Sequence, residues 1–464
     1  MKYILSIVVS FFISGQIALG VSLPAIFGDH MVLQQNAEVT IWGWGKPMEE
    51  ITVTPSWNNI PVTTVANSAA KWQLKLKTPI AGEGPYSLIV KGYNTIQLKD
   101  VLLGEVWFCS GQSNMEWSPR AGIDNIEQIK NAAHPEIRYF SVQHRTADAP
   151  QIDLGGNWAI STPESTMDFS AIAYFFGREL QENLNVPIGL INSSWGGTPA
   201  EVWVNEEVIA DNERLSTEAA KIQEMQWGPK DPGKAYNAMV APLIPYQIAG
   251  ALWYQGESNT YSPEAYTELL STLIKSWRSE WGYEFPFYYV QIAPYSYGRE
   301  LEGAVLRDAQ RKTLEVPGTG MVVISDIGNV DDIHPRNKLD VGLRLANLAL
   351  NKTYEKTDLP VSGPLYRDMK VEGKKIRLLF DYTEEGLIAE GGKLIHFEIA
   401  GEDKNFVPAK AKIDGNTVVV SSIEVKKPVA VRFAFTNKAT PNLFNKKGLP
   451  ASTFRTDDWE IELK

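Results

Sequence analysis

The chain has 464 residues, of which 44% are hydrophobic and 21% charged, and this is the composition of a folded protein rather than a disordered one. Its 55 acidic and 44 basic side chains give a formal net charge of −11, so nucleic acid is not expected as a partner. A single cysteine excludes an internal disulfide framework and any cysteine-based zinc or iron–sulfur site.

The first twenty residues have the pattern of a signal peptide. Lys2 supplies a positive charge, and Ile4 to Ile13 form an apolar stretch that is too short to span a bilayer. Ala18-Leu19-Gly20 provides small residues for cleavage, and no cysteine stands there to be lipidated. We therefore expect a secreted or periplasmic product, with an N-terminal anchor as the alternative and no membrane span in the mature chain.

Residues 21–100 read as short strands in which apolar and polar residues alternate, as in Trp72–Lys77 and Tyr86–Val90. Glycine, proline and asparagine separate these strands, as is usual for turns. The segment therefore predicts a small β-sandwich-like domain at the N-terminus.

Residues 101–352 alternate apolar, strand-like runs with helical patterns, which favours βαβ units and a mainly parallel sheet flanked by helices. Ser262-Pro263 is a good helix start, and the apolar residues from Leu269 to Trp281 follow at helical spacing. The expected strands are Val101–Cys109, Ile137–Val142, Pro187–Asn192, Ile248–Gln255, Phe285–Ile292 and Gly320–Ser325.

Residues 353–464 return to strand-like alternation, as in Lys375–Phe380 and Thr417–Val420. A second β domain is therefore expected to close the chain. The whole protein is predicted to be an α/β protein with a β-sandwich-like domain at each end.

Four of the central strands are followed directly by residues that carry chemistry. In an open parallel sheet, ligands bind beyond the carboxyl ends of the strands, so these residues are expected to converge. A serine, a glycine pair, an amide-bearing turn and an acid before a histidine are the parts of an acyl-transfer site. The segments are Gly111-Gln112-Ser113-Asn114-Met115, Ser194-Trp195-Gly196-Gly197-Thr198, Gly256-Glu257-Ser258-Asn259 and Asp331-Asp332-Ile333-His334-Pro335.

Each part taken alone also has a structural explanation. Ser113 could cap a helix or hydrogen-bond its own turn, and His334 before Pro335 could have the structural role of a helix cap. Gly196 and Gly197 could be turn glycines, and Glu257 a charge at a helix end. Their joint occurrence at the ends of strands of one predicted sheet favours the functional interpretation.

These segments resemble the sialate O-acetylesterase family, a branch of the SGNH (GDSL-type) esterases. The likeness is most specific in the middle domain, where it includes Trp253–Asn259, and it extends to Asn442–Asn445 and Leu449–Thr456 near the end. The resemblance implies an SGNH-hydrolase-like fold and a serine esterase. It makes Ser113 the nucleophile, His334 the base and Asp331, three residues before it, the acid that orients the imidazole.

The resemblance also implies an oxyanion hole formed by the backbone amides of Ser113 and of Gly196 or Gly197. The wider superfamily's Gly-Asp-Ser-Leu block reads here as Gly-Gln-Ser-Asn, and its Gly-x-Asn-Asp block reads as Gly-Glu-Ser-Asn. The side-chain amide that completes the hole is therefore open between Gln255 and Asn259. We favour Gln255, because it stands at the end of its strand.

The expected reaction is a two-step acyl transfer through an acetyl-enzyme, which requires no metal and no organic cofactor. The expected substrate is an O-acetylated sialic acid, deacetylated at the 9-position, or another acetylated glycan. Arg336 or Arg120 could pair with the sialic acid carboxylate. The further candidates for substrate contact are Gln112, Asn114, Trp117, Trp195, Tyr254 and Glu257, of which the aromatic ones could stack on a sugar or pack under the loops.

Three other functions remain open at this point. The same chemistry could act on acetylated xylan or pectin. Glu257 with Asp331 could hydrolyse glycosidic bonds, which would require their carboxyl groups to lie about 5 to 9.5 Å apart. The chain could also be a non-catalytic carbohydrate-binding protein in which the two β domains recognise the sugar.

Overall fold

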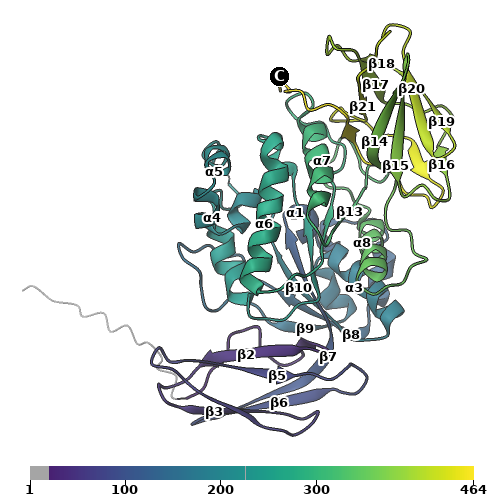
Figure 1. Ribbon diagram of the computed structural model, residues 1–464. Coiled ribbons are helices and arrows are strands. Elements are labelled where there is room, and N and C mark those ends of the chain that lie inside the picture. The colour runs from purple at the N-terminus through teal and green to yellow at the C-terminus, as the bar shows by residue number, and fades with distance from the viewer. Residues whose placement is uncertain (1–19, 225, 464) are drawn as a thin grey trace, which may run out of the picture.

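The computed structural model describes residues 20–224 and 226–463, in which a central α/β domain carries a β-rich domain at each end (Figure 1). The predicted signal peptide falls on residues 1–20, of which residues 1–19 lie outside the described part of the chain. Among the residues that are described, no helix has the length and the apolar character needed to cross a membrane.

The N-terminal domain is made of short strands whose side chains alternate between core and solvent. Along β5 every second residue is buried, including Trp72, Leu74 and Leu76, as a strand with one face on a core requires. Its strands are β1 (Val32–Gln34), β2 (Glu38–Trp44), β3 (Glu50–Pro55), β4 (Val62–Val65), β5 (Lys71–Lys77) and β6 (Tyr86–Lys91).

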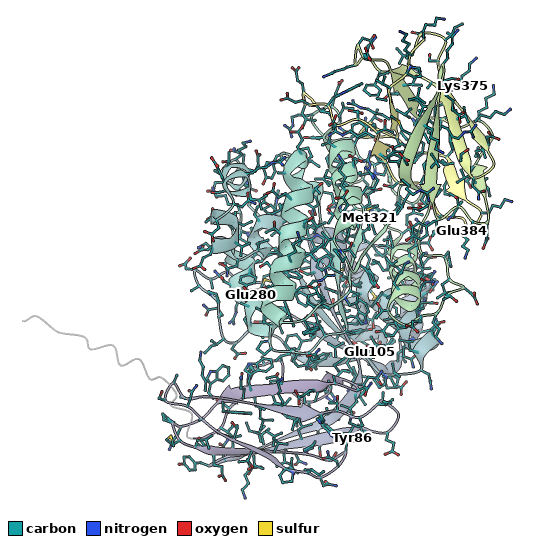
Figure 2. The ribbon with its side chains drawn as sticks, in the orientation of Figure 1. Tyr86, Glu105, Glu280, Met321, Lys375 and Glu384 are labelled. Carbon is teal, nitrogen blue, oxygen red and sulfur yellow. The ribbon has the colours of Figure 1, made fainter. Side chains whose placement is uncertain are left out.

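One long strand, β7 (Thr95–Gly111), joins the N-terminal domain to the central sheet. Its first half pairs with β6, and its second half pairs with β10 and β11. Glu105, labelled in Figure 2 at this junction, accepts hydrogen bonds from the side chains of Gln34, Gln35 and Tyr354. The boundary that the sequence predicts after residue 100 therefore falls inside a continuous strand.

The central sheet is parallel except at one edge, as the sequence predicts for the α/β domain. Its strands follow the order β13-β12-β11-β7-β10-β8-β9, and β7 lies in the middle. Only β9 runs antiparallel among these described strands, and it is an edge strand that the sequence pattern did not reveal. The strands besides β7 are β8 (His134–Ser141), β9 (Trp158–Ser161), β10 (Ile188–Ser194), β11 (Gly250–Tyr254), β12 (Phe287–Val290) and β13 (Thr319–Val322).

Helices cover both faces of this sheet (Figure 1). Neighbouring residues of a strand point to opposite faces, so Trp107 packs against Phe176 of α3 while Phe108 packs against Trp277 of α6. Both strand residues are buried, and α8 packs beside α3. The helices are α1 (Ser113–Glu116), α2 (Pro163–Met167), α3 (Ala171–Leu184), α4 (Glu206–Ala210), α5 (Glu213–Ala219), α6 (Tyr266–Trp281), α7 (Glu302–Lys312) and α8 (Lys338–Lys352).

The C-terminal domain is built from small antiparallel sheets around a core of its own. One sheet has the order β14-β15-β20-β19 and another the order β18-β17-β21-β23. The strands are β14 (Leu365–Glu372), β15 (Lys375–Asp381), β16 (Leu387–Ala389), β17 (Phe397–Ala400), β18 (Val407–Pro408), β19 (Lys410–Asp414), β20 (Thr417–Ser421), β21 (Ala430–Phe433), β22 (Leu443–Asn445) and β23 (Phe454–Arg455).

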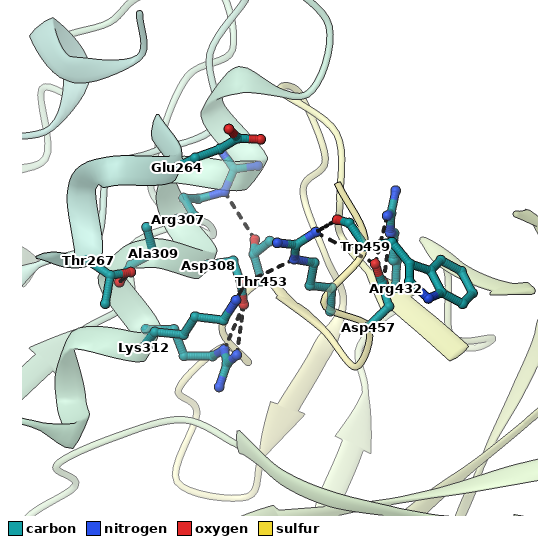
Figure 3. A network of polar contacts seen from close by, with 12 residues as sticks. Glu264, Thr267, Arg307, Asp308, Ala309, Lys312, Arg432, Thr453, Asp457 and Trp459 are labelled. Atoms are coloured by element: carbon teal, nitrogen blue, oxygen red, sulfur yellow. Dashed lines mark hydrogen bonds and ion pairs between the residues drawn. The ribbon is translucent and has the colours of Figure 1, made fainter. Parts of the chain in front are cut away.

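A buried polar network fastens this domain to α7 (Figure 3). Arg307 is fully buried and donates to the hydroxyl of Thr453 at 3.0 Å and to the carbonyl of Thr436 at 2.6 Å. Asp308, also buried, faces Arg455 of β23 with 3.7 Å between carboxylate and guanidinium. The C-terminal domain is therefore fixed to the central domain by charged groups that have lost their contact with water.

Arg307→Met should destabilise the protein, because the carbonyl oxygens that this guanidinium serves would remain buried without a donor. We expect a loss of about 1–3 kcal/mol for each such oxygen in the free energy of unfolding, measured by urea titration. Arg367→Met is the matched control, since Arg367 makes an exposed ion pair with Asp381, and exposed pairs contribute only about 0–1 kcal/mol. Equal stability of the two variants would contradict the structural role of Arg307.

Candidate active site

Ser113 stands on a sharp turn at the end of β7, the middle strand of the sheet. The strand ends at Gly111, and α1 begins with Ser113. Gly111 has φ +134°, and a Cβ there would lie 2.2 Å from the carbonyl oxygen of Tyr254, so the turn presses directly against β11. Only glycine fits this position. The backbone N–H of Ser113 lies in the first turn of α1, where no carbonyl of the helix can accept it.

The structure brings Ser113 together with His334, although 221 residues separate them. The Oγ of Ser113 lies 2.9 Å from the Nε2 of His334, which comes from the loop between β13 and α8. The indole of Trp117 stacks on the imidazole with ring centroids 4.6 Å apart, and this limits how the ring can turn. A hydroxyl and an imidazole at this distance form the pair needed for nucleophilic attack with general-base assistance.

The carboxyl group that faces the imidazole is that of Asp332. Its Oδ1 accepts the backbone N–H of His334 at 2.9 Å and lies 3.9 Å from Nδ1, which is an electrostatic contact rather than a hydrogen bond. Asp331, the orienting acid expected from the resemblance, is exposed, and among the described residues its carboxylate has no hydrogen bond or ion pair. The loop turns at Asn329, which accepts the N–H of Asp331, and so places the next residue toward the imidazole.

The surroundings of His334 keep its imidazole neutral. Burial lowers its pKa below the usual 6.5, and the nearby Lys338 cation lowers it further, while Asp332 acts in the opposite direction. A base must be unprotonated at the working pH in order to accept a proton. The imidazole is therefore available as a base at neutral pH.

The backbone N–H of Gly196 lies beside Ser113 and donates a hydrogen bond to the carboxylate of Glu116. A Cβ on Gly196 would lie 3.3 Å from the Cβ of Ser113, so the Trp195–Thr198 turn packs closely on the serine. The N–H of Gly196 donates to Oε2 of Glu116 at 2.5 Å, and Oε1 of the same carboxylate lies 3.1 Å from Nε2 of His144. An oxyanion hole needs an N–H donor at this position, and the Glu116 carboxylate occupies that donor in this structure.

The two side-chain amides considered for the oxyanion hole are used elsewhere. Gln255 is fully buried, and its Nε2 donates to the carbonyl of Thr198 and to Oδ1 of Asn259. Asn259 in turn donates to the buried Glu201 and accepts the N–H of Ala200. With both hydrogens of Gln255 engaged, the preference for this residue as an oxyanion donor has no support in the geometry.

Three of the residues expected to contact substrate are instead buried beneath the site, namely Asn114, Tyr254 and Glu257. Gln112 is also buried, and its Oε1 accepts the backbone N–H groups of Gly256 and Ser258. Gln112 and Asn114 thus join the strand-end loops, and all four side chains are buried.

The remaining candidates lie at the rim of the site. Trp117 stacks on His334, and the half-buried Trp195 stacks on His144 with centroids 4.4 Å apart. Arg336 is 63% exposed, with Asp332 as a distant partner at 3.9 Å. Arg120, the other arginine considered, is bound by both oxygens of Asp168.

Sequence reasoning missed four residues that the fold brings to the site. Glu116 and His144 flank Gly196, and Lys338 lies buried behind Asn114. The fourth is Trp227, which is 67% exposed and covers Gly197, where a Cβ would lie 2.6 Å from its indole Cδ1. Lys338 was foreseeable only as the first residue of a helix, and Trp227 stands in an irregular segment without any motif.

Among the described residues, no three His, Cys, Asp or Glu side chains gather as possible metal ligands. The groups that surround Ser113 are an imidazole and backbone N–H donors. This set matches acyl transfer.

Comparisons with known proteins agree with this chemistry. A family model described as carbohydrate esterase, sialic acid-specific acetylesterase, matches residues 103–351. The chain is 29% identical to the sialate O-acetylesterase of Pongo abelii, over 94% of this chain and 92% of that protein, and 28% identical to the human one with the same coverage. A solved carbohydrate acetylesterase from Xanthomonas citri is 38% identical, with a TM-score of 0.85, over 95% of this chain and 100% of that one.

The two neighbouring aspartates can be separated by mutation. Asp332→Asn should lower kcat by about 10- to 100-fold, because the imidazolium formed during the reaction loses its facing charge. It should also move the acidic limb of kcat/KM to lower pH, since Asp332 raises the pKa of His334. Asp331→Asn should change neither. Rates on an aryl acetate from pH 4.5 to 9 measure both effects, and the reverse outcome would return the role to Asp331.

Proposed function

The chain belongs to the sialic acid-specific acetylesterase family of carbohydrate esterases, and on that basis we propose that Ser113 and His334 remove O-acetyl groups from sialic acids through an acetyl-enzyme. It is a carboxylic ester hydrolase of the sialate O-acetylesterase type. The observation that carries the assignment of residues is the 2.9 Å contact between Ser113 Oγ and His334 Nε2.

In the first step, Ser113 Oγ attacks the acetyl carbonyl carbon while His334 Nε2 takes its proton. Negative charge develops on the carbonyl oxygen, where the N–H groups of Ser113 and Gly196 stabilise it. The carboxylate of Glu116 must move off Gly196 for this to occur, because its Oε2 holds that donor. The tetrahedral intermediate collapses, His334 returns the proton to the sugar oxygen, and the deacetylated sugar leaves.

In the second step, His334 takes a proton from water, and the resulting hydroxide attacks the acetyl-enzyme at the same carbonyl carbon. The bond to Ser113 breaks, Oγ receives the proton from His334, and acetate is released. Asp332 lies on the Nδ1 side of the ring throughout and stabilises the imidazolium that each half-reaction forms. The same N–H donors stabilise both tetrahedral intermediates. At the end of the second step Ser113 and His334 have returned to their starting protonation states.

Two exposed side chains at the rim of the site, those of Trp227 and Arg336, can contact the sugar part of the substrate. Trp227 presents a broad exposed indole beside Gly197, and its backbone oxygen accepts the indole N–H of Trp195 at 2.7 Å, which holds the loop against the site. Aromatic faces of this kind pack well against the apolar faces of sugar rings. Arg336, 63% exposed on the loop of His334, has a long 3.9 Å contact with Asp332 and can pair with the carboxylate of a sialic acid.

A neutral acetylated polysaccharide such as xylan is the second candidate, and one observation favours it. The Glu116 carboxylate lies next to Ser113, and like charges repel, so an anionic sugar must be held away from that side. Acetate release from 9-O-acetylated sialoglycans and from acetylated xylan, compared at equal enzyme concentration, separates the two substrates. Glycoside hydrolysis has less support, because Glu257 is buried beneath the serine.

We also propose that the protein is exported to the periplasm or the medium. The support is the sequence of residues 2–20, with a lysine, a short apolar stretch and small residues at the end. Fractionation of cells producing the full chain tests this, and mass spectrometry of the product locates the cleavage.

Ser113→Ala should fold normally and lose at least about 10⁴-fold in kcat on an aryl acetate, as expected when a nucleophile is removed. A fluorophosphonate probe should label Ser113 in the wild-type protein and fail to label the variant. Turnover within a few-fold of wild type, or labelling at another serine, would remove Ser113 from the mechanism.

Trp227→Ala should raise KM for an acetylated sugar about 3- to 10-fold, which corresponds to one lost stacking contact. It should leave hydrolysis of ethyl acetate unchanged, because that substrate has no ring to stack. Tyr93→Ala is the matched control, since Tyr93 is equally exposed, at 69%, but lies in the N-terminal domain. A KM that rises equally for both esters would mean that Trp227 shapes the acetyl site instead.

A further inference from the structure

A lysine and a glutamate are buried together directly behind the Ser113 turn. Lys338 is fully buried at the first position of α8, and Glu257, only 7% exposed, lies in the turn after β11. Both side chains are buried, and the proposed mechanism uses neither. Burial raises the pKa of Glu257 to about 7 and lowers the pKa of Lys338 to about 7. Burying two ionisable groups is costly and frequently less stabilising than an apolar pair of the same volume, so stability alone does not explain them.

Asn114 links these two charges and has no polar atom left over. Its Oδ1 accepts from Nζ of Lys338 at 2.7 Å, and its Nδ2 donates to Oε1 of Glu257 at 2.7 Å and to the carbonyl of Ile333 at 3.0 Å. The amide can therefore sit in only one orientation. Asn114 is the residue after Ser113, and Ile333 is the residue before His334, so this amide bridges the two reacting segments.

Lys338 also contacts the ring that holds the base. Its Nζ lies 5.1 Å from the centroid of Trp117, and the same indole stacks on the imidazole of His334. A cation at the N-terminus of a helix is opposed by the helix dipole, which makes its place at the start of α8 a further cost. The arrangement does little to stabilise the carboxyl group of Glu257, because its Oε2 is buried with no hydrogen-bond partner among the described residues.

We infer that Lys338, together with Asn114 and Glu257, forms a buried clamp that fixes the separation of Ser113 and His334, and that Lys338 is a positioning residue of the esterase. The clamp ties together the turn after β7, the turn after β11, and the loop between β13 and α8. A displacement of about 1 Å between reacting groups costs roughly 100-fold in rate, so holding three loops in register is a direct contribution to turnover. This inference rests on the proposed function.

The charge of Lys338 gives the clamp a measurable signature. Two charged groups face His334, namely Asp332 on its own loop and Lys338 on α8, and Glu257 and Asp332 in turn face Lys338. The Lys338 cation disfavours the imidazolium and so lowers the pKa of His334. Removing the cation should raise the pKa of His334. Because kcat/KM depends on the neutral imidazole, it should then begin to fall at a higher pH as the solution is made more acidic.

The test uses Lys338→Met in the full chain, with an aryl acetate as substrate. We expect kcat to fall about 10- to 100-fold with KM nearly unchanged, because Lys338 does not touch the substrate. The acidic limb of kcat/KM should move to higher pH. Lys352→Met at the other end of α8 is the matched control and should behave as wild type. Unchanged kcat and an unshifted limb in Lys338→Met would overturn the inference.

The double variant Lys338→Met/Glu257→Gln separates positioning from simple charge neutralisation. It leaves no unpaired buried charge, so its unfolding temperature should return toward that of wild type, and it replaces the single variant if that one does not fold. If Lys338 positions the site, the low kcat and the shifted limb persist in the double variant. Recovery of wild-type kcat and pH profile would show that Lys338 only neutralises Glu257, and would overturn the inference.

An NMR titration of His334 keeps the inference separate from the proposed function. It is carried out in Ser113→Ala with and without Lys338→Met, so it needs no turnover. A higher pKa of His334 in Ser113→Ala/Lys338→Met than in Ser113→Ala supports the clamp even if the wild-type protein proves inactive on acetyl esters. An identical pKa in both variants would count against the clamp, whatever the activity.

Discussion

The esterase site depends on one hydrogen bond, between a hydroxyl on the middle strand of the sheet and an imidazole from a loop more than two hundred residues later. The bond can form because Gly111 lets the Ser113 turn pack closely against β11. A side chain at position 111 would clash with the carbonyl oxygen of Tyr254. Parallel strands then deliver the other loops to the same edge. The glycine is therefore as necessary to the site as the serine that it positions.

The residues around this bond divide into those proposed to react and those that hold loops. Gln112, Gln255 and Asn259 look like binding residues in the sequence, yet their side chains bond to neighbouring loops of the same edge. Loops that end parallel strands leave backbone N–H and C=O groups without partners in a buried place, and side-chain amides satisfy both kinds. A motif rich in amides thus reflects the construction of the site as much as its chemistry.

Buried contacts join each flanking domain to the central domain. The strand β7 passes without a break from the N-terminal domain into the middle of the parallel sheet, so Ser113, the proposed nucleophile, stands just beyond the far end of an element that begins in another domain. At the other end, Arg307 fastens the C-terminal domain to α7. The N-terminal domain shares an apolar core with the central domain, in which Phe27 packs on Tyr246. At the C-terminal junction, the hydrogen bonds of Arg307 have preferred directions and so help to set the orientation of the domain.

The sequence by itself determined the α/β class of the middle part and the β-rich parts at both ends, and it pointed to the segments proposed to carry the chemistry. Periodicity reports which residues are buried, and strand ends follow from it. Only the tertiary structure decided the rest. Whether Asp331 or Asp332 faces the imidazole depends on the turn at Asn329. The sequence pattern cannot show which of two neighbouring aspartates points toward the histidine. Trp227, Glu116 and Lys338 reach the site through packing between segments distant in the chain, and such contacts leave no local trace in the sequence.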